Sequence, residues 1–347
     1  MKMNLLGRTD LMVSELCLGS MTWGARNSKQ EGHAQIDFAL DRGVNIIDTA
    51  EMYPASANIG EFLGRTEEII GEWNTRTGRR LDYILATKHS GAGLKAARGG
   101  APITAESIPI AIEGSLKRLK TDYIDLYQFH WPNRGSYMFR QNWTYDPSYQ
   151  ITDEIFENMC KCLEALKLEI KRGTIRHFGL SNESAWGTSQ WLMLSGQGKG
   201  PRVVSIQNEY SLLCRLYDTD LCELSVNEDV GLLAYSPLGA GLLTGKYQND
   251  EVPEGSRMSF GRGLGGRSTA RAFEAVQAYL DIGTRYGIDP VHLALAFCRM
   301  RPFMCSVIFG ATSLQQLDRI LSSVDVNLTD EVLNEIDHAH RAHPLPF

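Results

Sequence analysis

The chain has 347 residues, of which 43% are hydrophobic and 22% charged, and its formal net charge is −6. This is the composition of a globular protein that dissolves in water, and a chain this long buries a large core without disulfide bonds or metals. Charges of both signs are interspersed and there is no basic stripe, which argues against nucleic acid and anionic membranes as partners.

Short β-rich runs alternate along the chain with amphipathic segments of helix length. The predicted strands are 15–18, 44–48, 83–88, 124–130, 177–181, 203–207, 231–235 and 306–308. The predicted helices lie near 30–42, 60–76, 105–119, 152–172, 184–194, 219–228, 290–301 and 313–321. This alternation indicates parallel βαβ units, and eight of them is the number found in a closed (β/α)8 TIM barrel. We expect one barrel domain over residues 1–347.

Several segments fall outside the eight units. Residues 1–13 are predicted to form a β-hairpin, with its turn at 7–10, that closes the bottom of the barrel. Insertions at 137–149 and 248–266 follow the fourth and seventh strands, on the face where barrel active sites form. They are candidate lids or substrate walls. An extra helix is expected at 271–286 and a C-terminal helix at 328–341, capped by Thr329.

The seven cysteines are scattered and show neither a CxxC motif nor zinc-like spacing with histidine. We therefore expect reduced, mostly buried thiols and no metal. The N-terminal segment carries Arg8, Asp10 and Glu15 and so lacks the apolar core of a signal peptide. No stretch approaches 18 apolar residues, and a cytoplasmic protein is expected.

Four polar residues fall at or just past strand ends in the first 130 residues: Asp48, Tyr53, Lys88 and His130. Because a parallel barrel gathers strand C-termini on one face, these side chains are candidates for one active site. Lysine beside a phenol favours phenolate and would lower the pKa of Tyr53 towards neutrality, which suits a general acid. A neighbouring histidine could donate a hydrogen bond to a carbonyl oxygen.

Each of these residues taken alone could instead have a structural role, in a hydrogen bond or ion pair at the barrel rim. A lysine at a strand end could also form a Schiff base, as in an aldolase. That chemistry needs a depressed lysine pKa, whereas pairing with Asp48 would raise the pKa of Lys88.

Longer motifs resemble one known family over nearly the whole chain. They are 18–24 (LGSMTWG), 43–53 (GVNIIDTAEMY), 115–128 (SLKRLKTDYIDLYQ), 179–182 (GLSN), 207–213 (QNEYSLL) and 235–247 (YSPLGAGLLTGKY). In this order and spacing they are similar to the aldo-keto reductases. Within that family they most resemble the long bacterial Tas-type members related to β-subunits of voltage-gated potassium channels.

The resemblance implies an NADPH-dependent reduction of aldehydes or ketones to alcohols without a metal. Tyr53 would be the proton donor, Lys88 paired with Asp48 would tune it, and His130 would orient the carbonyl. The alternative is an accessory or redox-sensing protein, like a channel β-subunit, that binds NADP(H) and turns over slowly. The residue pattern leaves the natural substrate and the oligomeric state open.

The same resemblance implies a cofactor site along the later strands. The residues it assigns to nicotinamide, its ribose and the pyrophosphate are Ser20, Met21, Asp48, Ser181, Asn182, Gln207, Tyr235, Ser236, Pro237, Leu238, Gly239, Ala240 and Gly241. Lys246 and Arg257 match cationic positions near the 2′-phosphate of NADP, and Gly310 and Gln316 belong to the adenine-side segment.

This chain departs from its relatives at the adenine end, where it has Arg319 and Ile320 instead of the usual Glu or Thr and Asn. The adenine contact of that Asn is thus lost or replaced, and we hypothesise that Arg319 meets the 2′-phosphate. Trp23, Trp131, Tyr53 and His130 are predicted to line the substrate pocket. For each tryptophan, ordinary packing at the barrel rim is the competing interpretation.

Overall fold

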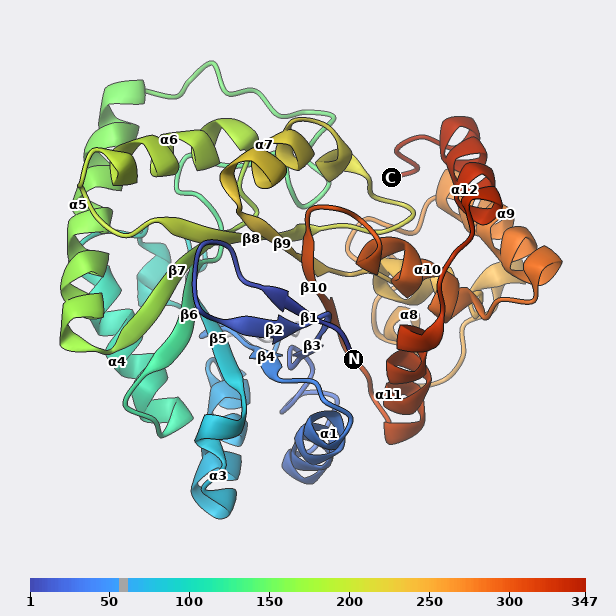
Figure 1. The fold of residues 1–347 in the computed structure, drawn as a ribbon, viewed down its shortest axis with the longest axis horizontal. Coiled ribbons are helices and arrows are strands. Elements are labelled where there is room, and N and C mark those ends of the chain that lie inside the picture. Colours follow the sequence, from blue (N-terminus) through green and yellow to red (C-terminus); the bar gives the residue numbers. More distant parts are fainter. Residues whose placement is uncertain (56–61) are drawn as a thin grey trace.

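Eight parallel strands form a closed barrel at the centre of the protein (Figure 1). The computed structural model describes residues 1–55 and 62–347. Around the barrel the strands are β3 (Leu16–Gly19), β4 (Ile46–Asp48), β5 (Ile84–His89), β6 (Ile124–Phe129), β7 (Ile175–Ser181), β8 (Val203–Glu209), β9 (Gly231–Tyr235) and β10 (Met304–Phe309). β10 pairs with both β9 and β3, which closes the ring and confirms the predicted (β/α)8 TIM barrel.

Helices surround the barrel where the sequence predicts them. They are α1 (Lys29–Asp41), α3 (Arg65–Thr77), α4 (Ser107–Leu119), α5 (Thr152–Arg172), α6 (Ala185–Gly196), α7 (Asp220–Glu228), α10 (Pro290–Arg299) and α11 (Leu314–Leu321). The start of the helix predicted at 60–76 falls on residues 60–61, which lie outside the described residues. A capping box of Ser28 and Glu31 begins α1, and Gly173 in the left-handed conformation ends α5.

The N-terminal hairpin closes one end of the barrel, as predicted. β1 (Met3–Leu5) pairs antiparallel with β2 (Met12–Ser14), and the two cross the barrel in Figure 1. Leu6 and Val13 are fully buried in the same cluster as Ile46, Ala86 and Leu126 from three barrel strands. The barrel is therefore filled with side chains at this end, and its polar groups gather at the other.

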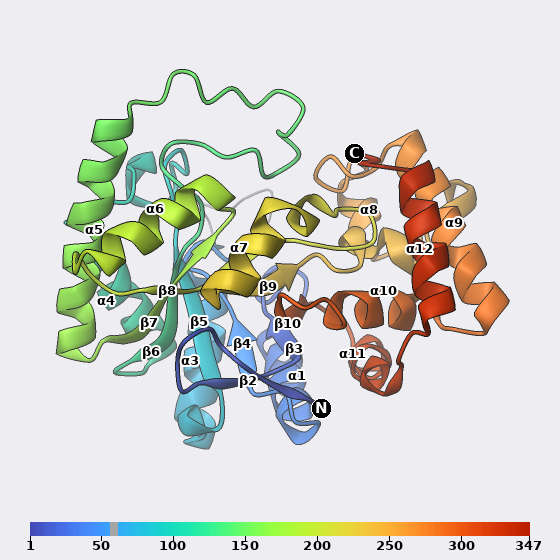
Figure 2. The ribbon, with the colours of Figure 1, turned by 45° about the horizontal axis from the view of Figure 1, so that its top comes forward.

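Two long segments lie over the strand C-termini. Residues 130–151 connect β6 to α5 and run along one end of the molecule (Figure 2). Residues 236–269 lie between β9 and α9 (Ala270–Tyr286) and contain the short helix α8 (Arg257–Phe260). α9 packs beside the C-terminal helix α12 (Asp330–Ala342), which Thr329 caps as predicted.

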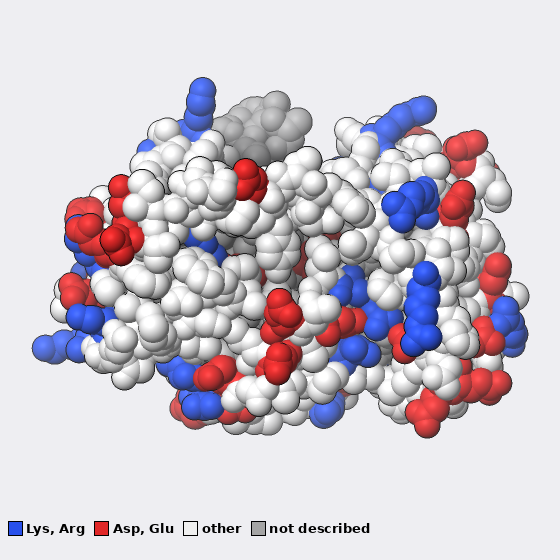
Figure 3. All heavy atoms as spheres, turned by 90° about the horizontal axis from the view of Figure 1, so that it is seen from above, with Lys and Arg blue, Asp and Glu red and all other residues white. Residues whose placement is uncertain are grey.

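The seven cysteines are all free thiols, and five of them are buried. Burial raises the pKa of the Cys17 thiol well above its usual value and that of Cys305 to about 12. In residues 1–55 and 62–347, no helix is long and apolar enough to cross a membrane. Lys and Arg are interspersed with Asp and Glu over the face seen in Figure 3.

Candidate active site

A buried ion pair joins two neighbouring strands at the open end of the barrel. Lys88 Nζ lies 2.7 Å from Asp48 Oδ2 and donates a second bond of 2.7 Å to the Thr49 carbonyl. The Lys88 side chain is fully buried. Burial alone lowers its pKa, but the negative charge and hydrogen bond of Asp48 outweigh this and raise the pKa above its ordinary value. Lys88 therefore remains an ammonium ion at neutral pH, whereas a Schiff base would need the free amine.

Tyr53 lies above this pair on the loop that follows β4. Its ring centroid is 4.9 Å from Lys88 Nζ, and the side chain is almost completely buried. Burial raises the pKa of Tyr53, and the charge of Lys88 offsets only part of that rise, so the net direction is upward. The expected shift towards neutrality is therefore wrong for this structure, because the sequence does not reveal how completely the phenol is buried. Tyr53 is protonated at neutral pH.

His130 faces the Tyr53 ring from the end of β6, which β5 separates from β4. It follows the last residue of β6, one position beyond the observed strand, and its ring centroid is 5.8 Å from that of Tyr53 in an edge contact. Burial and then the charge of Lys88 lower the pKa of His130 well below its ordinary value, so the imidazole is neutral. Among the described residues, no hydrogen-bond partner reaches its buried Nδ1.

Two glutamine amides hold the other oxygen of Asp48. Gln207 Nε2 donates to Asp48 Oδ1 at 2.8 Å and to Gln128 Oε1 at 3.2 Å, and Gln128 Nε2 lies 3.4 Å from the same carboxylate oxygen. Gln128 was absent from the predicted site. Strand alternation contains the signal, since Gln128 lies two residues before His130 and so faces the same side.

A second buried ion pair fixes the loop that carries Tyr53. Glu51 accepts one bond from each terminal nitrogen of Arg98, both of 2.7 Å, and a 2.5 Å bond from the main-chain nitrogen of Ser90. Ser90 follows β5, the strand of Lys88, so this Glu51–Arg98 clamp joins the Tyr53 loop to the Lys88 strand. It was missed because 47 residues separate the partners, and Arg98 lies outside the motif at 43–53 that contains Glu51.

Residues predicted to hold the nicotinamide come together at the ends of β7, β8 and β9. Ser181 Oγ donates to the Gln207 carbonyl at 2.8 Å, and Asn182 Nδ2 donates to the His130 carbonyl at 2.8 Å. The Tyr235 hydroxyl donates to Asn182 Oδ1 at 2.7 Å. On the opposite side, Ser20 Oγ donates to the Asp48 carbonyl at 2.7 Å, and half-buried Met21 follows it.

The segment predicted to follow the pyrophosphate turns tightly after β9. Ser236 has a φ of 55°, and after Pro237 and Leu238 the residues Gly239, Ala240 and Gly241 have φ of 56°, 59° and 99°. Within this turn the main-chain N–H groups of Gly239 and Gly241 donate to the carbonyls of Ser236 and Leu238, each at 2.9 Å. Exposed Lys246 follows at the end of this loop.

Arginines crowd the same side of the site. Burial lowers the pKa of Arg257, and the nearby charges of Arg267 and Arg26 lower it further. Arg140 and Arg267 both bind Glu209, at 2.9 and 2.6 Å, but no carboxylate among the described residues lies within 4 Å of the Arg257 guanidinium. A cation that other cations surround in this way favours an anionic ligand such as a phosphate.

The adenine-side residues already bond to other groups of the protein. Gln316 Oε1 accepts bonds from the main chain and hydroxyl of Thr312, two residues after Gly310. Arg319 is held by Asp289, the N-cap of α10, with Nε and Nη2 at 2.9 and 2.7 Å from Oδ2. Ile320 is buried in the core. A 2′-phosphate would have to compete with Asp289 for Arg319.

The two tryptophans predicted for the substrate pocket have different surroundings. Trp23 is completely buried, and its indole N–H bonds Gln35 of α1 at 3.1 Å, so it belongs to the core and not to an accessible wall. Trp131 is half-buried, its ring centroid is 5.0 Å from that of His130, and its N–H donates to the Ala92 carbonyl. The structure brings Trp131, but not Trp23, to the tetrad.

A neutral imidazole and a protonated phenol meeting over a buried lysine–aspartate pair, at the open end of a (β/α)8 barrel, define an enzyme-like site suited to proton transfer. The aldo/keto reductase family matches residues 15–341, and the chain belongs to this family. It is therefore an oxidoreductase, and its substrate is a small molecule.

Three relatives illustrate the range of this similarity. The chain is 41% identical to Protein tas of Escherichia coli (strain K12), over 100% of this chain and 99% of that protein. It is 31% identical to a probable voltage-gated potassium channel subunit beta of Arabidopsis thaliana, over 98% of this chain and 96% of that protein. It is 26% identical to norsolorinic acid reductase B of Aspergillus parasiticus, over 96% of this chain and 82% of that protein.

Proposed function

We propose that the protein reduces aldehydes or ketones to alcohols with NADPH, and that Tyr53 donates the proton. The observation that carries this proposal is the contact of Tyr53 with both Lys88 and His130 in a buried site. A carbonyl oxygen that gains electrons needs a proton at once, and a protonated phenol in a low-dielectric site is placed to give it. NADPH, when bound, supplies the hydride.

The roles of the chain's own groups follow from their charge states. A carbonyl oxygen between Tyr53 and His130 accepts hydrogen bonds from the phenol and from a neutral imidazole, which can donate without releasing its proton. As the phenol transfers its proton, the developing phenolate lies near the Lys88 ammonium and is stabilised by it. Asp48 keeps that ammonium charged and in position.

The cofactor proposal is supported by how well the site residues suit a nicotinamide dinucleotide phosphate. Ser181, Asn182 and Gln207 offer amide and hydroxyl groups for a carboxamide, and Tyr235 offers a flat ring for stacking. The small residues of the turn at 239–241 would let a pyrophosphate approach the main chain, where among the described residues the Ala240 N–H has no main-chain acceptor. Lys246 and Arg257 offer positive charge for the 2′-phosphate, which favours NADP over NAD.

The test is consumption of NADPH with a panel of aromatic and medium-chain aldehydes and ketones. Wild type should oxidise NADPH, whereas Tyr53→Phe should lose about 10²–10⁴-fold in turnover, the usual contribution of a general acid. The control is Tyr123→Phe, which changes a tyrosine whose ring packs against Arg80 and Arg176, outside the site. Equal rates for Tyr53→Phe and wild type would overturn the assignment of the proton donor.

The alternative is an accessory or redox-sensing protein that binds NADP(H) and turns over slowly. This alternative is supported by the similarity of the chain to a protein named as a probable voltage-gated potassium channel subunit beta. Comparing the first oxidation of bound NADPH by an aldehyde with repeated turnover in excess NADPH and aldehyde separates the two. A reductase completes the turnover and rapidly releases product, whereas an accessory protein would oxidise its bound cofactor once and stall.

A further inference from the structure

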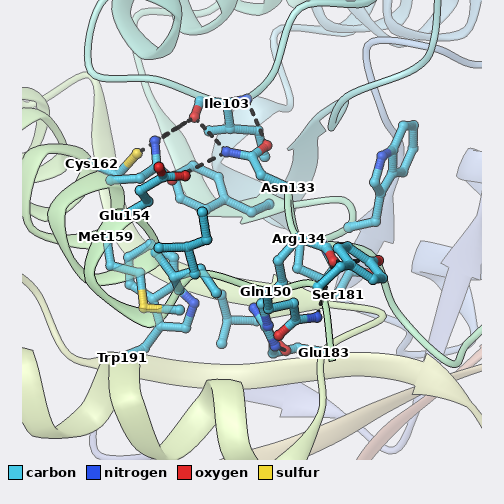
Figure 4. A pocket seen from close by; sticks show the side chains of 18 residues that line it. Ile103, Asn133, Arg134, Gln150, Glu154, Met159, Cys162, Ser181, Glu183 and Trp191 are labelled. Atoms are coloured by element: carbon cyan, nitrogen blue, oxygen red, sulfur yellow. Dashed lines mark hydrogen bonds and ion pairs between the residues drawn. The ribbon is translucent and has the colours of Figure 1, made fainter. Parts of the chain in front are cut away.

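A cavity of about 300 Å³ lies outside the barrel wall, under the segment that connects β6 to α5 (Figure 4). The first turns of α5, the ends of β6 and β7, and α6 enclose it. Gln128 and His130 belong to the tetrad side of β6, so Phe129 between them faces the helices and this cavity. The cavity is thus separated from the reacting groups by the strand ends.

The inner wall of the cavity is apolar and aromatic. Phe129 and Trp191 meet there edge to face, with ring centroids 5.7 Å apart, and both are nearly fully buried. Met159 of α5 and Leu180 of β7 complete this wall. Aromatic rings accept a flat ligand, and the flexible thioether of Met159 adapts to its outline. At about 300 Å³ the cavity is at the lower end of small-molecule sites, enough for one or two rings.

The charged and amide groups around the cavity already satisfy one another. Arg134 forms a two-nitrogen ion pair with Glu183, and its guanidinium also donates to Ser184. Asn133 and Asn158 both donate to the Ile103 carbonyl, at 2.8 and 3.1 Å. Among the described residues, no buried charge in this wall is left for a ligand to neutralise, so the cavity favours an uncharged molecule.

Hydrogen-bond acceptors remain at the mouth. Within residues 1–55 and 62–347, neither Gln150 Oε1 nor the exposed Glu154 carboxylate has a protein partner, although Gln150 Nε2 is held by Arg134 and Tyr145. An acceptor-rich mouth over an aromatic floor suits a ligand with a ring at one end and a hydroxyl at the other. A carboxylate on the same ring would be repelled by Glu154.

We propose that this cavity is a second ligand site, separate from the reacting groups, that binds an uncharged one- or two-ring aromatic molecule bearing a hydroxyl group. Two of its wall residues also border the tetrad side, because Trp131 contacts the His130 ring and Ser181 bonds the Gln207 carbonyl. Binding at this site does not depend on the proposed reductase activity.

The test is calorimetric titration of the full chain with 2-naphthol, with 2-naphthoate as the charged counterpart. Saturable binding of 2-naphthol with a Kd below about 1 mM is expected, and binding at least about 10-fold weaker for the carboxylate. Ile155→Trp fills the cavity from α5 and should weaken binding at least about 10-fold. Leu168→Trp, which adds the same ring at an exposed position of the same helix, should leave it unchanged.

Two further variants separate binding in the cavity from binding at the reaction site. Ile151→Trp blocks the mouth from an exposed position, so it tests the cavity even where Ile155→Trp fails to fold. Tyr53→Trp alters the reaction site and should leave 2-naphthol binding in place. Loss of binding in Tyr53→Trp with retention in both cavity variants would overturn the proposal, as would the absence of saturable binding to wild type.

Discussion

Replacing Arg98 by alanine tests whether the Glu51–Arg98 clamp holds the site together. The variant leaves the Glu51 carboxylate, whose side chain is 6% exposed, without its cation. Removing one partner of a buried ion pair costs about 3–5 kcal/mol, since the remaining charge is desolvated without compensation. The Arg98 side chain is 20% exposed, which lets water approach the vacated volume, so we expect the lower end, about 3 kcal/mol.

Urea denaturation at neutral pH measures this cost. The matched control is Arg8→Ala, which breaks an ion pair with Asp229 whose side chains are 51% and 61% exposed and should cost less than about 1 kcal/mol. Arg98→Ala should also lower kcat more than it changes KM for the carbonyl, because the loop that carries Tyr53 loses its link to the Lys88 strand. If Arg98→Ala and Arg8→Ala destabilise the protein equally, the clamp has no special role.

The pH dependence of the unfolding free energy tests the Glu51–Arg98 clamp independently. Burial alone raises the pKa of Glu51, but the hydrogen bonds and charge of Arg98, together with the nearby His89, bring it below its ordinary value of 4.5. A carboxylate with a depressed folded-state pKa contributes stability above its unfolded pKa and loses it as the pH falls through the folded one. The stability difference between wild type and Arg98→Ala should therefore shrink below about pH 4.5, and a constant difference at acid pH would contradict this assignment.

Three further predictions concern other parts of the barrel. Lys88→Met should reduce kcat for NADPH-dependent reduction by at least about 100-fold, because the developing phenolate loses its cation; undiminished turnover would exclude the proposed role. Burial lowers the pKa of His89 to about 4, so its contribution to the unfolding free energy falls as pH drops from 6.5 to 4, by about 3 kcal/mol. Urea titrations of His89→Gln should show a flatter profile over that window. Gly71→Ala would place a Cβ 2.1 Å from the Arg118 carbonyl oxygen and should destabilise the protein by about 1–3 kcal/mol in urea denaturation. Gly196→Ala meets nothing within 4 Å and should stabilise the protein slightly in the same measurement.

The fold was predictable because each βα unit of the barrel has a recognisable local sequence pattern. Strand runs such as 124–130 and helices such as 152–172 have their own periodicity, and their alternation leaves few arrangements for the chain. Asp48, Lys88 and His130 were found in the same way, since a polar residue at the end of an apolar strand stands out. Strand boundaries moved by a few residues, as at β4, which begins at Ile46 instead of residue 44.

What the sequence does not encode locally is how deeply a side chain is buried and which distant residue it meets. The direction of the Tyr53 pKa shift depends on burial by several elements and was expected wrongly. Trp23 was predicted to line the pocket, but its indole N–H donates a hydrogen bond to Gln35 and the side chain is buried in the core. Arg98 and Glu51 meet through tertiary contact only. Gln128 is the exception, because strand alternation from His130 already indicated its direction.

The burial of the thiols makes the protein a convenient scaffold for site-directed labelling. Among the described residues, the partly accessible thiols are Cys160 and Cys222. Burial raises the pKa of the Cys222 thiol, which reduces the thiolate that reacts with a maleimide or a nitroxide reagent. Serine at those two positions would leave five enclosed thiols in place. A cysteine introduced at exposed Trp143, in the segment that covers the strand ends, would then accept a single reporter group.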